Sequence, residues 1–239
     1  MAGLNRKLLV IKVATIFLIG YFLFLLPQHV DIPYIDSYHL QFLNYDIYAQ
    51  FGYFKGSMSF IVLFILLFYF IYHSQISVLS ENTSYLSMVF TRFKRKEIIY
   101  AVLKDSLIDN GIAYITGICC VILLDIISNF IVYRMIMFSL IEYVMFSIYY
   151  FKIIIYIYVI TSGLRLMTFV KNTGRYTIYG YIGFIVALML DLFLNTRFIG
   201  MSCSASQTII WCLVDSLLSL FILYRVIRKF LKEKEFYYD

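Results

Sequence analysis

The chain contains little that interrupts a helix and little that carries charge. It has two prolines in 239 residues, and charged residues make up 14% of it, whereas about 25% is usual for a soluble domain. Hydrophobic residues account for 62% of the chain, and the mean hydropathy is +0.85. A soluble domain of this size could not bury so much apolar surface. The composition therefore excludes an ordinary soluble protein and indicates an integral membrane protein.

Sequence motifs for nucleotide binding and hydrolytic chemistry are also absent. The chain has no Gly-x-x-x-x-Gly-Lys-Ser/Thr loop that could hold nucleotide phosphates, and no His-Glu-x-x-His pair. Ser162 is not part of a Gly-x-Ser-x-Gly turn. The histidines, His29, His39 and His73, fall on opposite sides of the predicted membrane, so they cannot converge on a metal. We therefore expect no enzymatic activity, no metal site and no cofactor in this chain.

The four cysteines do not have the spacing of a zinc site or a disulfide framework. Cys119 and Cys120 are adjacent, and Cys203 and Cys212 lie far along the chain. We expect all four to serve as small residues in or beside membrane helices.

Six apolar stretches are each long enough to cross a bilayer, which takes about 20 residues in a helix. They lie at roughly residues 8–27, 57–79, 107–128, 137–160, 177–196 and 207–224. The connections between them are short, so the sequence predicts one all-α transmembrane domain over residues 1–239. The first stretch is too long for the apolar core of a signal peptide, and no small-residue cleavage site follows it.

Positive charge is concentrated on one side of these predicted spans. When the N-terminus is placed in the cytoplasm, only Lys55, Arg134 and Arg197 lie outside, and only Lys12 and Lys152 lie within spans. The positive-inside rule then predicts six helices with both termini cytoplasmic. The net charge of +6 is explained by this topology and by contact with anionic membrane lipid, so we expect no nucleic-acid partner.

The connection between the second and third predicted spans contains an amphipathic, basic stretch, which we call the coupling segment (residues 80–97). Ser80 is suited to cap a helix, and Glu81 follows in the first turn, where the helix dipole favours an acidic residue. Apolar residues then recur on one helix face and basic residues accompany them: Leu86, Val89, Phe90 and Phe93, with Arg92, Lys94, Arg95 and Lys96. The pattern predicts a short helix along the inner membrane surface, with a basic end available to lipid phosphate or an acidic partner. The alternative is a basic loop that only enforces topology.

This arrangement resembles the membrane subunit of ABC transporters of the ABC-2 (type V exporter) class. The resemblance rests on Glu81 at the exit of the second span, the amphipathic helix, and then Arg92, Arg95 and Lys104 before the third span. Members of that class have six spans with both termini inside, and the corresponding helix docks into a separate ATP-binding subunit. The resemblance implies two permease protomers, identical or paralogous, that pair with two ATP-binding cassette subunits. ATP and Mg would be bound by those subunits and not by this chain.

Further features relate the chain to one part of that class. The stretch from Thr161 to Arg175 resembles the family's second docking element. The first predicted span begins at about residue 8, without the preceding interfacial helix that is frequent in the family, and the external stretch 197–206 is too short for a large re-entrant hairpin. Both departures are closer to compact bacterial permeases for export of, or immunity to, amphipathic peptides. The resemblance therefore implies a multi-pass protein of the bacterial plasma membrane whose substrate is an amphipathic peptide or a lipid-like molecule.

Ionisable residues within the predicted spans are costly in a bilayer and usually face the interior of the helix bundle. Lys152 and Asp215 lie at similar predicted depth, so an ion pair between them would lower the cost of both. The full set is Asp125, Glu142, Lys152, Asp191 and Asp215. These residues either pair structurally or line a pathway for a cationic or amphipathic substrate.

Two other functions fit the same sequence. The intramembrane charges could serve an ion-coupled secondary carrier or a channel, although no inverted repeat or pair of broken helices is evident. Alternatively, the chain could be a non-transporting membrane scaffold whose basic residues 92–96 bind lipid.

Overall fold

The computed structural model describes residues 2–20, 64–73, 94–133, 140–168, 178–189 and 205–232. The four long helices are α1 (Ala2–Gly20), α5 (Arg95–Tyr133), α6 (Leu140–Thr168) and α8 (Ala205–Lys232). Two short apolar helices, Phe64–His73 and Ile178–Met189, complete the described part, which contains no strand. The all-α fold class is therefore confirmed for these residues.

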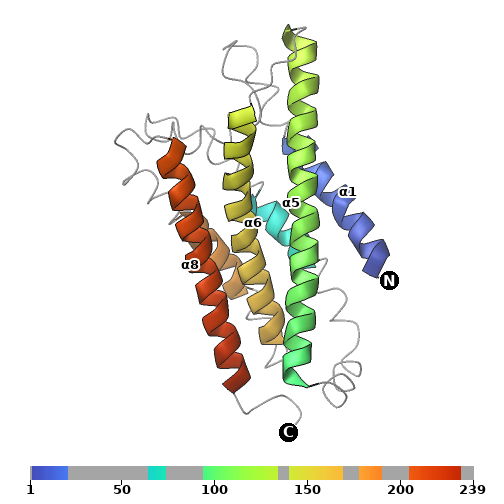
Figure 1. The fold of residues 1–239 in the computed structure, drawn as a ribbon. Coiled ribbons are helices and arrows are strands. Elements are labelled where there is room, and N and C mark those ends of the chain that lie inside the picture. The colour runs from blue at the N-terminus through green and yellow to red at the C-terminus, as the bar shows by residue number, and fades with distance from the viewer. Residues whose placement is uncertain are drawn as a thin grey trace.

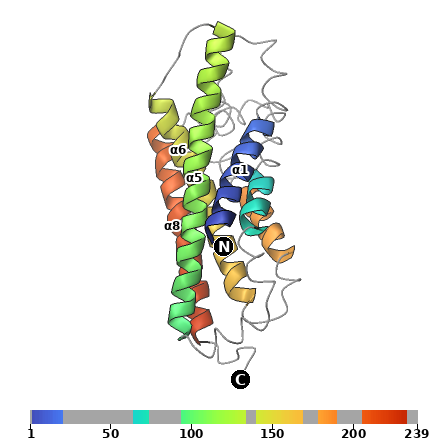
Figure 2. The same ribbon diagram turned by 90° about the vertical axis from the view of Figure 1, so that its right-hand side faces the viewer.

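The long helices form an elongated bundle (Figure 1). α5 packs against α1 and α6, and α6 packs against α8. α1 and α5 run upward in Figure 1, whereas α6 and α8 run downward. In the second view the two short helices lie beside α1, on the side away from α8 (Figure 2).

The first turn of α5 is held by a side chain that caps it. The backbone amide of Lys94 donates to the carboxylate of Glu97 at 3.0 Å, while the amides of Glu97 and Ile98 donate to the Lys94 carbonyl at 2.9 and 3.2 Å. This is one half of a capping box, with an acidic side chain near the positive end of the helix dipole. The helix consequently starts at Arg95 and not at about residue 107, where the apolar stretch begins.

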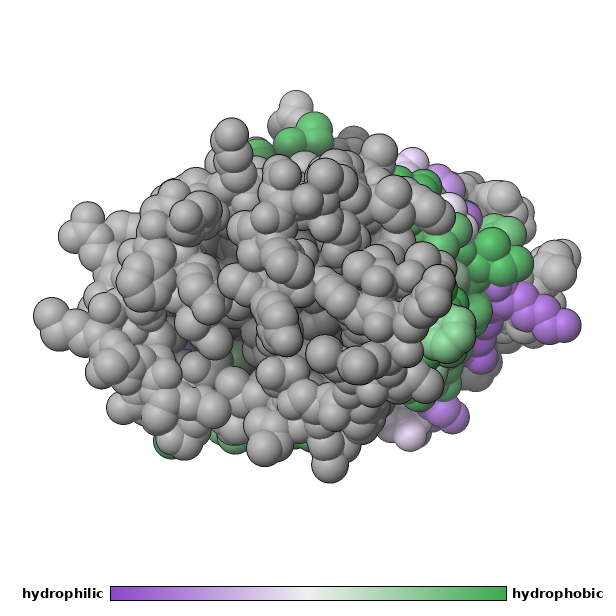
Figure 3. Space-filling model, turned by 90° about the horizontal axis from the view of Figure 1, so that it is seen from above, coloured by the Kyte–Doolittle hydropathy of each residue, from purple (hydrophilic) through white to green (hydrophobic). Residues whose placement is uncertain are grey.

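The described residues contain one helix that is long and apolar enough to cross a membrane, the segment Lys96–Leu124 of α5. Only 22% of its most apolar stretch is buried inside the molecule, so it does not resemble the core helix of a soluble protein. Large apolar side chains instead point outward along α5: Leu107, Ile115, Leu123, Ile127 and Phe130. Where the described residues are visible in Figure 3, hydrophobic and hydrophilic residues lie side by side at this end of the molecule. The other five spans stay predictions.

Tyr150 of α6 joins three helices in the core. Its hydroxyl donates to the carbonyl of Ala113 at 3.1 Å, and its ring stacks on Tyr114 with a centroid distance of 5.6 Å. Phe17 of α1 meets the same ring edge-on at 5.7 Å. The ring fits against α5 because residue 117 is glycine: a Cβ atom there would lie 2.5 Å from the Tyr150 hydroxyl oxygen.

A second aromatic group connects the two short helices to each other and to α1. Phe68 stacks on Phe184 with a centroid distance of 4.7 Å and meets Tyr181 edge-on at 4.9 Å. The ammonium of Lys12 lies 5.5 Å from the centroid of the Phe70 ring, a cation–π geometry that lowers the cost of a charge inside the bundle. These contacts hold the short helices against the long ones.

Candidate functional site

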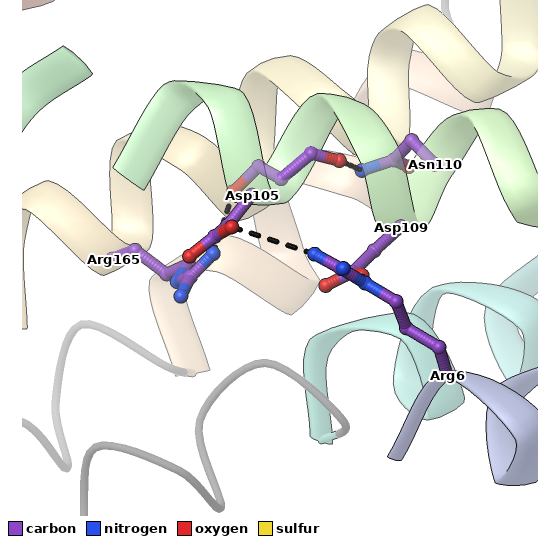
Figure 4. Close-up of polar contacts among 6 residues, drawn as sticks. Arg6, Asp105, Asp109, Asn110 and Arg165 are labelled. Atoms are coloured by element: carbon purple, nitrogen blue, oxygen red, sulfur yellow. Dashed lines mark hydrogen bonds and ion pairs between the residues drawn. The ribbon is translucent and has the colours of Figure 1, made fainter. Parts of the chain in front are cut away.

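The largest polar feature of the described residues lies where α1 and α5 begin and α6 ends, and we call it the ionic cluster (Arg6, Asp105, Ser106, Asp109, Asn110 and Arg165). Four of its members come from consecutive turns of α5. Residues four apart share a helix face, so α5 presents two adjacent polar pairs: Asp105 with Asp109, and Ser106 with Asn110. Figure 4 shows the first pair turned toward Arg6 of α1. The second pair lies on the side of α5 that contacts Arg165 of α6.

Within the ionic cluster, α1 contacts α5 through one arginine that bridges two carboxylates. The Arg6 Nε donates to Asp109 at 3.3 Å, and its Nη2 donates to Asp105 at 3.4 Å. Both distances exceed the 2.7–2.9 Å that is usual for charge-assisted hydrogen bonds. The Arg6 side chain is 32% exposed and that of Asp105 is 56% exposed. Water therefore competes for the bond to Asp105, which is the weaker half of the bridge, whereas the Asp109 side chain is only 15% exposed.

The contact between α5 and α6 is shorter and buried. Nη1 of Arg165 donates to the Ser106 hydroxyl at 3.0 Å, and both residues are buried. The Ser106 carbonyl accepts a hydrogen bond from the Asn110 amide at 2.8 Å, while the buried Oδ1 of Asn110 has no hydrogen-bond partner among the described residues. A buried hydrogen bond from a charged donor is costly to break. Within the ionic cluster, the contact of α5 with α6 is therefore harder to break than the contact of α5 with α1.

The charges within the ionic cluster balance, with two arginines facing two aspartates. Burial lowers the pKa of the Arg165 guanidinium, and the nearby carboxylates of Asp109 and Asp105 oppose that shift. A buried arginine needs such compensation, because an unpaired charge away from water is strongly destabilising. The ionic cluster can therefore hold α1, α5 and α6 together, or its charged side chains can exchange partners when these helices move.

Part of the predicted coupling segment falls within the described residues. Lys94 and Lys96 are exposed at the start of α5, and Arg95 is its first residue. The stretch 95–97 thus belongs to the long helix and is not the end of a separate short one. The remaining predicted coupling residues lie outside the described ranges: Glu81, Leu86, Val89, Phe90, Arg92 and Phe93.

The structure places two of the five predicted intramembrane charges on neighbouring helices. Lys152 of α6 is 1% exposed, and Asp215 of α8 is half-buried, on two helices that pack against each other. Their direct ion pair stays a prediction. Asp125 is a residue of α5 and Glu142 is a residue of α6, whereas Asp191 lies outside the described ranges.

Sequence reasoning missed the ionic cluster, although a signal for it exists. Asp105-Ser106 and Asp109-Asn110 repeat an acidic residue followed by a small polar one at an interval of four, across the beginning of the third predicted span. That interval indicates two polar stripes on one helix. From the sequence, Arg6 is interpreted as one of the basic residues that set the topology, and Arg165 as one of these and as part of the stretch that resembles a second docking element. The sequence does not show that their helices are neighbours of α5.

Comparison of the chain with protein-family models, curated proteins and solved structures found no match. The resemblance to the ABC-2 class accordingly rests on the sequence features given above. The groups that the described residues bring together are two guanidiniums, two carboxylates and two small polar side chains. Among all the residues that the structure describes, no group of three or more His, Cys, Asp or Glu side chains could hold a metal ion.

Proposed function

We propose that this chain is the permease subunit of an ATP-driven exporter of the ABC-2 class, in the plasma membrane of a bacterium. It would move amphipathic peptides or lipid-like molecules, and a separate ATP-binding subunit would supply the energy. The observation that carries the proposal is the form of α5. This helix runs without interruption from an exposed, basic first turn into a segment apolar enough to cross a membrane.

The exposed face of α5 changes character along its length, which supports a membrane boundary at about Asp105. Before that point, Lys96, Tyr100 and Lys104 are exposed, whereas after it the exposed side chains are apolar and begin with Leu107. Lysine and tyrosine are the residues that favour the level of the lipid headgroups and the water beside them.

Two other helices change character at the same end of the bundle. On α1, exposed Lys7 is followed by exposed Leu8 and Ile11, and Arg6 lies within reach of Asp105 and Asp109. On α8, exposed Phe221 and Tyr224 are followed by exposed Arg225. These changes support the placement of the beginning of α1 and the end of α8 on the basic side of a membrane.

Helix lengths and directions support further spans. α6 has 29 residues and α8 has 28, and a helix needs about 20 to cross the hydrocarbon core. α1 and α5, at the first and third predicted spans, run opposite to α6 and α8, at the fourth and sixth (Figure 1). Six spans with both termini inside require these directions.

The length of α5 before the boundary favours a protein partner over lipid alone. From Arg95 to Asp105 the helix rises by about 15 Å, whereas the headgroup region on one side of a bilayer is only about 5–8 Å thick. The first turns of α5 therefore extend beyond the headgroups when the helix is upright. They carry the end of the coupling segment and would follow the movement of an ATP-binding subunit when ATP and Mg bind to it.

Co-purification tests this function. A variant with Lys94→Glu, Lys96→Glu and Lys104→Glu reverses three exposed charges on α5, and Arg225→Glu with Arg228→Glu is the control at the same end of α8. We expect an ATP-binding protein to accompany the wild type and the α8 control from native membranes, and to be lost from the α5 variant. The proposal is wrong if no nucleotide-binding protein accompanies a folded wild-type sample.

One observation favours a second candidate, an ion-coupled carrier. Lys152 is almost completely buried in the middle of α6, and ionisable groups at such positions occur in proton and ion relays. In that case, transport by the purified chain in vesicles would need an ion gradient and no nucleotide. Lys152→Met would abolish it.

A further inference from the structure

We propose that Arg6, Asp105 and Asp109 form a latch that holds the beginning of α1 against α5 in one state and opens in another. The Arg165–Ser106 contact keeps α6 and α5 together in both states. The second part of the proposal, that nucleotide binding by the partner opens the latch, depends on the proposed function.

The first argument is the difference between the two junctions of the ionic cluster. The Arg6–Asp105 bridge measures 3.4 Å and is open to water, and the Arg6–Asp109 bridge measures 3.3 Å and is half-buried, whereas the Arg165–Ser106 bond measures 3.0 Å and is buried. Exposed ion pairs contribute little to stability, and water replaces them at low cost. Breaking the buried bond would leave polar groups unsatisfied. Movement at this end of the bundle therefore separates α1 from α5 more easily than it separates α5 from α6.

The second argument is that Arg6 has two carboxylate partners on one helix, of which Asp105 is exposed and Asp109 is half-buried. Asp105 and Asp109 are one turn apart, which corresponds to a rise of about 5–6 Å along the helix axis. Arg6 uses a different nitrogen for each carboxylate, so it can keep one while it releases the other. Displacements of about one turn between packed helices are an established form of conformational switching.

The third argument is the location of the latch. It lies between the basic first turns of α5 and the aromatic contact of Phe17 with Tyr150, where α1 meets α6 deeper in the bundle. Force applied to the start of α5 reaches the latch before it reaches that contact. Opening would therefore free the start of α1, while Phe17 still holds its later turns.

Distance measurements between spin labels in lipid vesicles test the latch without any nucleotide. The native cysteines are first replaced by serine. Labels at Lys7→Cys and Arg228→Cys then report on α1 relative to α8, and labels at Lys104→Cys and Arg228→Cys report on α5 relative to α8. We expect Arg6→Gln to shift the first distance by about 5 Å, one helix turn, and to leave the second unchanged.

Two further variants separate a latch from general loosening of the fold. The exchange Arg6→Asp with Asp109→Arg restores the opposite charges, and we expect it to return the wild-type distance. Asp105→Asn with Asp109→Asn is expected to match Arg6→Gln. If Arg6→Gln leaves the α1–α8 distance unchanged, or moves both distances equally, the latch does not exist.

The same labels test the link to ATP. With the co-purified ATP-binding partner present, ATP is expected to move the wild-type α1–α8 distance in the direction that Arg6→Gln moves it. A distance that ignores ATP, in a complex that hydrolyses it, refutes the nucleotide-driven part of the latch but not the exporter. Absence of any ATP-binding partner refutes the proposed function instead, and the nucleotide-free distances still decide whether the latch exists.

Discussion

The fit of Tyr150 against α5 predicts opposite effects for one substitution at two glycines of the same helix. A Cβ atom at Gly117 would lie 2.5 Å from the Tyr150 hydroxyl oxygen and 2.7 Å from two ring carbons, whereas a Cβ atom at Gly111 meets nothing within 4 Å. Both changes to alanine gain about 1 kcal/mol of helix propensity. Only the change at Gly117 also forces a buried aromatic ring to move.

The size of the effect follows from that ring. Overpacking a core costs about 1–3 kcal/mol, and loss of the hydrogen bond from Tyr150 to the Ala113 carbonyl adds about 1 kcal/mol. After subtraction of the propensity gain, Gly117→Ala should lower stability by about 1–3 kcal/mol, and Gly111→Ala should raise it by up to about 1 kcal/mol. For a chain of this size, 1 kcal/mol corresponds to about 2–4 °C in Tm.

Thermal unfolding of the purified protein in one detergent and at one scan rate measures the difference, because membrane proteins often unfold irreversibly. The double variant Gly117→Ala with Tyr150→Phe removes the hydroxyl that makes the shortest contact, and we expect it to regain part of the loss. If Gly117→Ala has a Tm equal to or higher than that of Gly111→Ala, the proposed packing of α5 against Tyr150 is wrong.

Two further predictions use the same protein. Ser106→Ala removes an acceptor of the Arg165 guanidinium and should cost about 1.5–3 kcal/mol, whereas Thr15→Val, which removes an exposed hydroxyl bonded to the Ile11 carbonyl of its own helix, should cost less than about 0.5 kcal/mol. Equal losses of Tm would contradict the role of the ionic cluster. Exposed Cys119 should react with an apolar maleimide in vesicles much faster than buried Cys212. Mass spectrometry of the labelled peptides compares the two reactions, and equal labelling would mean that the outward face of α5 is covered.

The all-α fold class could be predicted from the sequence, because its apolar stretches are long and poor in proline; one helix that is long and apolar enough to cross a membrane lies among the described residues. The start of α5 at Arg95 could not be predicted from the sequence, because hydropathy places the boundary of a span where the exposed face of the helix turns polar. The helix itself continues to Arg95, where Ile98, Ile99 and Val102 remain buried on its inner face. Hydropathy detects the membrane boundary, whereas a buried periodic face and a capping side chain mark the end of the helix.

The candidate site was predictable only in part. The basic residues Lys94 and Lys96 were identified from the sequence, and the structure places both at the exposed start of α5. The ionic cluster was missed because its bonded residues are far apart along the chain, by 103 positions for Arg6 and Asp109 and by 59 for Arg165 and Ser106. Their meeting depends on the packing of α1 and α6 against α5, which no local pattern encodes.

The unbroken length of α5 has a mechanical consequence. The helix of 39 residues is about 58 Å long, and its contact with Tyr150 at Gly117 lies about 33 Å from the basic end and about 24 Å from the other end. Because the Arg165–Ser106 bond keeps α6 with α5, the two helices would turn together about this level, as a lever with unequal arms. A displacement of about 5 Å at the basic end would then move the far end of α5 by about 4 Å in the opposite direction, relative to α1.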